Sequence, residues 1–210
     1  MFTLIKREIQ DHIVYFLAAA LFSAVLIVAI VSMVLGRDSY GPPPGALALL
    51  FPATVVVVIG FSAMGASQMY TDRARKISAF LATLPVTRGR ILIARIVTGI
   101  LAILVLLVPL AVAAAILFRL IVPPCPVYPP FVAEIFAVVF LMGFACYCLG
   151  LQAGWSSNKT IPTLGSLALT CAIVPLIIIK GFGLYIVVIL LALIVCCLVR
   201  TWDEFTSTSL

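Results

Sequence analysis

Cysteine and histidine are the residues of this sequence that could most readily bind a metal or form a redox pair. The sequence has six cysteines and a single histidine, His12, and it contains no C-x-x-C pair. Cys125 lies in a predicted loop, without an obvious partner. The other cysteines lie inside apolar runs, where cysteine usually packs as a small hydrophobic residue: Cys146, Cys148, Cys171, Cys196 and Cys197. A zinc site lacks candidate ligands, so we expect neither a metal site nor a disulfide.

The sequence also lacks the motifs of intramembrane and nucleotide-dependent enzymes. It contains no H-E-x-x-H, no G-x-S-x-G and no pair of aspartates within an apolar run. It has no G-x-x-x-x-G-K-[ST] phosphate loop either. We therefore expect that the chain is not an enzyme and binds no cofactor of its own.

Glu134 is the one acidic residue inside a predicted span, close to the outer end of that span. An acid at this position can favour the N-terminus of a helix, or it can form an outer ion pair with Arg119 across the loop. A role in moving protons or substrate is the alternative. If the chain moves a cargo, the lack of a central charge in the spans makes an apolar or amphiphilic cargo more plausible than a small ion.

Composition places these residues in a membrane protein. Hydrophobic residues make up 65% of the chain, charged residues 10%, and the mean hydropathy is +1.33, whereas a soluble domain carries about 25% charged residues. The net charge of +6 does not indicate nucleic acid, because the basic residues occur in short runs between apolar stretches. The expected fold is all-α, with residues 1–210 forming a single transmembrane domain.

Six apolar segments are each close to the length of about 20 residues that a spanning helix needs. They are residues 13–35, 46–69, 91–118, 131–153, 161–179 and 181–199. The first is too long for a signal peptide and is expected to stay uncleaved. Only Lys180 and a Gly-Phe-Gly turn separate the last two, so five spans are the alternative count.

Charge distribution predicts that both termini lie in the cytoplasm. With this orientation, most of the 13 Lys and Arg residues are cytoplasmic and three are external. The external ones are Arg37, Arg119 and Lys180. The cytoplasmic ones are Lys6, Arg7, Arg73, Arg75, Lys76, Arg88, Arg90, Arg95, Lys159 and Arg200. The chain is therefore expected to be a multi-pass protein of the cytoplasmic membrane.

Small residues in the fourth span form a G-x-x-x-G motif, Gly150 to Gly154, which allows two helices to approach closely. The partner helix can belong to the same chain or to a second copy. Both alternatives remain open from the sequence.

The segment between the second and third spans, residues 70–85, is predicted to be a short amphipathic cytoplasmic helix. Its apolar residues share one face at i, i+3, i+4 and i+7: Ile77, Phe80, Leu81 and Leu84. Thr71 or Asp72 can cap its N-terminus, and Pro85 ends it. Its basic residues include Arg73, Arg75 and Lys76. A helix of this kind can lie on anionic lipid or dock on a partner protein.

This segment resembles the membrane subunit of type-2 ABC exporters at one sharp motif of about 25 residues. In that family an acidic start leads to a Leu-Pro-small-Ser/Thr-Arg stretch at this point, although the usual acid is glutamate. The matching residues are Asp72, Phe80, Leu81, Leu84, Pro85, Val86, Thr87, Arg88 and Arg95. The layout is similar as well, with six spans, internal termini and an amphipathic helix at 1–12.

The resemblance implies that residues 70–85 form a coupling helix seated on a separate ABC ATPase subunit, which would bind the ATP and Mg. The residues implied in ATPase docking are Asp72, Arg75, Lys76, Ile77, Phe80, Leu81, Leu84 and Arg88. It also implies a second copy of this chain, or a similar permease, because one six-span chain is half of a typical translocation unit. A non-transporting membrane anchor, which passes ATPase motion to a partner membrane protein, is the alternative.

Overall fold

The computed structural model describes residues 2–35, 44–74, 88–121, 128–155 and 184–207, and every structural statement below concerns these residues. All of them lie in or directly beside α-helices, which confirms the predicted fold class for this part of the chain. The helices are α1 (Phe2–Asp11), α2 (Ile13–Leu35), α3 (Pro44–Ala74), α5 (Arg88–Ile121), α6 (Tyr128–Trp155) and α8 (Leu184–Ser207).

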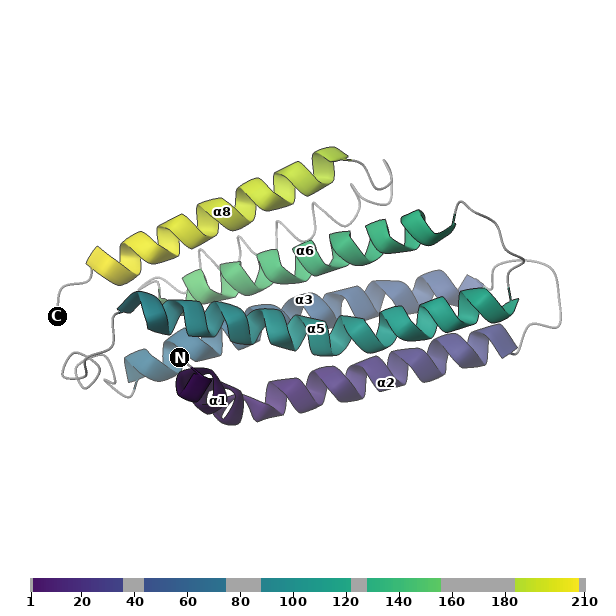
Figure 1. Cartoon of the computed structure of the whole chain (residues 1–210), viewed down its shortest axis with the longest axis horizontal. Helices are drawn as coiled ribbons and strands as arrows, with labels where there is room; N and C mark the ends of the chain where they lie inside the picture. The colour runs from purple at the N-terminus through teal and green to yellow at the C-terminus, as the bar shows by residue number, and fades with distance from the viewer. Residues whose placement is uncertain (1, 36–43, 75–87, 122–127, 156–183, 208–210) are drawn as a thin grey trace.

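The five long helices lie side by side in an elongated bundle (Figure 1). Helices α3, α6 and α8 run in one direction, and α2 and α5 run in the opposite direction. Helix α3 packs against α6, α6 against α8, and α2 against α5. The short helix α1 lies crosswise at one end, where both termini are found (Figure 1).

Four helices are long and apolar enough to cross a membrane: Ile13–Ser32, Gly89–Leu117, Phe136–Gly154 and Tyr185–Asp203. The corresponding apolar stretch of α3 is shorter, Val55–Tyr70. Large apolar side chains on the outer faces of these helices are exposed, among them Leu21 and Val195. A protein with such surfaces belongs in lipid. The predicted span 161–179 lies outside the described residues.

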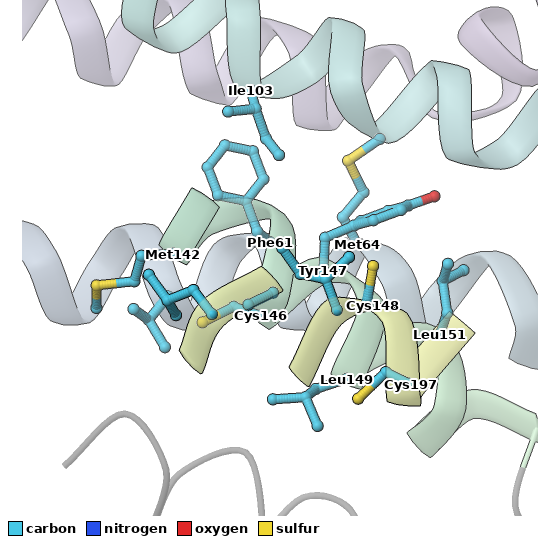
Figure 2. Close-up of a cluster of buried hydrophobic side chains, with 14 of the residues drawn as sticks. Phe61, Met64, Ile103, Met142, Cys146, Tyr147, Cys148, Leu149, Leu151 and Cys197 are labelled. Atoms are coloured by element: carbon cyan, nitrogen blue, oxygen red, sulfur yellow. The ribbon is translucent and has the colours of Figure 1, made fainter. Parts of the chain in front are cut away.

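Apolar side chains from α3, α5, α6 and α8 form the core of the bundle. Figure 2 shows Phe61, Ile103, Tyr147 and Cys197, one from each of these helices, gathered in this cluster. Cys146 and Cys148 are buried in the same cluster, which agrees with the expectation that they pack as small hydrophobic residues.

The end of α3 differs from the one predicted. Helix α2 begins and ends where the first span was predicted, but α3 continues beyond residue 69 to Ala74. Thr71 and Asp72 therefore lie inside α3 and do not cap a new helix. No Gly or Pro occurs from Tyr70 to Ala74, so the backbone ladder of α3 can continue.

The G-x-x-x-G motif packs within the chain, against α3. A Cβ atom on Gly154 would lie 2.5 Å from the carbonyl oxygen of Ala66, and one on Gly150 would collide with the carbonyl group of Ser62. On the facing helix, a Cβ on Gly65 would lie 2.5 Å from the carbonyl oxygen of Tyr147. The backbones of α3 and α6 touch along this seam, which small residues permit.

Gly150→Ala is expected to destabilise the protein by about 1–3 kcal/mol, the usual cost of overpacking. The added methyl group meets backbone atoms of Ser62, which cannot turn aside as a side chain could. The matched control is Gly60→Ala, because a Cβ at Gly60 meets nothing within 4 Å. The free energy of unfolding of both variants is measured in detergent by titration with a denaturant. Equal stability of the two would contradict the close packing of α3 and α6.

Candidate functional site: a buried polar junction at one end of the bundle

Arg95 is a charged side chain buried within the bundle. It lies on the core-facing side of α5, together with Leu92 and Thr98, and only 2% of it is exposed. Its Nη1 lies 2.9 Å from Sδ of Met69 on α3, and its Nε lies 3.6 Å from Oε1 of Glu8 on α1. Arg95 is one of the basic residues predicted on the cytoplasmic side, and in the structure its side chain lies inside the bundle and not on a solvated surface.

Helix α1 turns its acidic residue Glu8 toward the bundle. Its half-buried side chains follow helical spacing on one face, and its exposed ones occupy the other face. The half-buried residues are Leu4, Ile5, Glu8 and Ile9, and the exposed ones are Lys6, Arg7, Gln10 and Asp11. The apolar face of the amphipathic helix predicted at residues 1–12 is therefore partly covered by protein.

His12 follows α1 and is also buried, with 9% exposure. Its Nδ1 lies 3.1 Å from the carbonyl oxygen of Glu8 and 3.7 Å from Oε2 of the same residue. The Glu8 carboxylate therefore lies between His12 and Arg95.

Tyr147 joins α6 to this group. Its hydroxyl lies 2.6 Å from Oε1 of Gln68 and 2.8 Å from the carbonyl oxygen of Arg95, and one proton can serve one of these acceptors at a time. Gly99 allows this approach, because a Cβ there would collide with the Tyr147 ring. Nε2 of Gln68 is buried and has no hydrogen-bond partner among the described residues. If the Gln68 amide is rotated, its Nε2 donates to the Tyr147 hydroxyl. That hydroxyl then donates its own proton to the carbonyl oxygen of Arg95.

These contacts make one polar junction of four helices, defined by Glu8, Gln68, Met69, Arg95 and Tyr147. A buried guanidinium is costly without a nearby acid, and Glu8 supplies one. The junction therefore fixes the relative positions of α1, α3, α5 and α6. It contains no pairing of a nucleophile with a base. No group of His, Cys, Asp and Glu suited to hold a metal ion occurs in the described part of the chain.

The predicted docking residues adjoin this junction in the sequence. Asp72 lies in α3, four residues after Gln68, and Arg88 begins α5, seven residues before Arg95. The other predicted docking residues lie outside the described part: Arg75, Lys76, Ile77, Phe80, Leu81 and Leu84. Their docking role stays a prediction.

The predicted outer ion pair concerns the other end of α5. Arg119 is in α5, and Glu134 is exposed on α6. The side chain of Arg119 is outside the described part, so this pair also stays a prediction.

One feature of the sequence indicates the junction. Arg95 falls inside the predicted span 91–118, and a charge in a span is normally paired within the protein. The sequence does not indicate that Glu8 faces the bundle, because an acid in an amphipathic terminal helix commonly lies on the solvated face.

The chain matches no protein-family model, no curated protein sequence and no solved structure. The proposed function therefore rests on the arrangement of the helices and on the polar junction.

Proposed function

We propose that this chain is the membrane-spanning subunit of an ABC exporter, driven by ATP hydrolysis in a separate cytoplasmic subunit. The observation that carries the proposal is the position of the polar junction. It joins α3 and α5, the helices on both sides of residues 75–87, which include most of the predicted coupling helix 70–85. A force applied to this segment would act directly on the part of the bundle that Arg95 holds together.

Helix geometry supports a mechanical connection. The rise of an α-helix is about 1.5 Å per residue, so Arg88 and Arg95 are separated by about 10 Å along the axis of α5. Gln68 and Asp72 are separated by about 6 Å along α3. Both helices are continuous over these stretches. Displacement of the segment would therefore be transmitted to the junction with little loss.

Helix direction supports six crossings. Helices α6 and α8 run the same way (Figure 1), as they would if the predicted span 161–179 crossed the membrane between them. Together with α2, α3, α5, α6 and α8, a span there would make six crossings and would leave α1 and the end of α8 at the same end of the bundle. The charge distribution supports a cytoplasmic location for that end, in a protein of the cytoplasmic membrane.

The core of the bundle supports a cargo of low polarity. Away from the junction, the buried side chains of α3, α5, α6 and α8 are predominantly apolar. A second six-span chain, either a copy or a similar permease, would complete the pathway.

Purification from the native membrane is the direct test of this function. The chain is expected to bring with it a soluble subunit that contains a phosphate-loop motif, and the complex is expected to hydrolyse ATP. Mass spectrometry identifies the subunit, and phosphate release measures its activity. Recovery of the intact, inserted chain without any ATPase would contradict the proposal.

A further inference from the structure

We infer that α1 is a latch: Glu8 fastens it to Arg95, and it swings about His12 when this ion pair is broken. The inference concerns the docking of α1 and is independent of the proposed transport function. It follows from three features of the described residues: the weak apolar contact of α1, the short connection to α2, and the burial of Arg95.

The apolar contact between residues 4–11 of α1 and the bundle is small. None of the residues from Leu4 to Asp11 is fully buried, and the apolar residues on the inner face are only half-buried. Hydrophobic stabilisation follows the apolar area removed from water, so these few side chains hold α1 weakly. The charged contact between Glu8 and Arg95 therefore has a large share in its docking.

The connection between α1 and α2 is suited to a hinge. Helix α1 ends at Asp11 and α2 begins at Ile13, so His12 alone links them. Two backbone hydrogen bonds border this turn, from His12 N to Glu8 O (3.1 Å) and from Tyr15 N to His12 O (3.0 Å). Rotation at one residue would swing α1 away and leave α2 in place.

The burial of Arg95 gives the latch two distinct states. Arg95 is held on the bundle side by its contact with Met69 and by the Tyr147 hydroxyl at its carbonyl oxygen. Glu8 is the part that moves with α1. A buried cation that loses a carboxylate is penalised strongly, so partial separation is unfavourable. The helix is therefore docked with the pair formed, or released with the pair broken.

Thiol labelling measures docking directly. A cysteine placed at Ile5, on the half-covered inner face of α1, is labelled with a membrane-impermeant maleimide in purified full-length chain. A sample without this cysteine corrects for the native thiols. Glu8→Gln is expected to raise the labelling rate about tenfold or more, and tenfold corresponds to about 1.4 kcal/mol.

The matched control is Asp11→Asn, which removes the same charge from the exposed face of α1. Asp11 pairs at 3.8 Å with Arg7, and both side chains are exposed. This variant should leave the Ile5→Cys rate unchanged. A cysteine at the exposed Lys6 should be labelled at the same rate in every variant.

A double variant provides a comparison that can be made even if Glu8→Gln does not fold. Glu8→Gln with Arg95→Gln removes both charges of the ion pair, so its Ile5→Cys rate should fall below that of Glu8→Gln alone. If Glu8→Gln does not fold, the double variant is compared with the wild type, and a rate within about threefold of wild type is expected. An unchanged rate in Glu8→Gln, an equal rise in Asp11→Asn, or additive effects in the double variant would each overturn the latch.

Discussion

Replacing Phe80 and Leu81 by aspartate is expected to abolish co-purification of the ATPase while the chain remains inserted and folded. These residues form the centre of the apolar stripe predicted on the segment between α3 and α5. Each large apolar side chain buried in a partner's cleft contributes about 1.5–3 kcal/mol. Two carboxylates in that cleft would also need to be desolvated, so the loss should exceed the loss of contact area alone.

The matched control introduces the same two charges on the opposite face of the segment, as Ala79→Asp with Ala82→Asp. By helical spacing these positions lie away from the apolar stripe, so the ATPase should be retained. Size-exclusion elution in detergent verifies folding of both variants. Retention of the ATPase at wild-type stoichiometry by the Phe80/Leu81 variant would contradict docking and favour a segment that lies on lipid.

Long apolar helices were the part of the fold that the sequence predicted best. A helix in lipid must satisfy its backbone internally and needs about 20 apolar residues, so its length and composition are visible in the sequence. Helix α2 matches its predicted range at both ends. The end of α3 was predicted less well, because a capping residue such as Asp72 is also compatible with the interior of a helix that is already formed.

Helix partners were not predictable, because they depend on the tertiary arrangement. The spacing of Gly150 and Gly154 identified a surface for close packing but could not choose between α3 and a second copy. Arg95 illustrates the same difficulty for a charge. The charge distribution placed it among the cytoplasmic charges and gave no indication of its ion pair with Glu8, 87 residues earlier in the chain.

Arg95→Met should be the most destabilising single substitution of the junction, because it breaks a buried ion pair and preserves most of the apolar side-chain volume. Breaking such a pair typically costs about 3–5 kcal/mol, since the remaining charge is left unpaired. We expect about 3 kcal/mol here, because the Glu8 side chain is 19% exposed and can regain some hydration. The free energy of unfolding is measured by titration with a denaturing detergent.

The control is Arg90→Met on the same helix, because Arg90 is exposed and lies about one and a half turns before Arg95. It should change stability by less than about 0.5 kcal/mol, as surface substitutions usually do. Adding Glu8→Gln to Arg95→Met should then recover part of the lost stability, because the unpaired carboxylate is removed. If Arg95→Met is as stable as Arg90→Met, the ion pair does not hold α1, α3, α5 and α6 together. The docking of α1 would then depend on apolar packing, and the contact between Glu8 and Arg95 would not pass motion of the segment between α3 and α5 to α1.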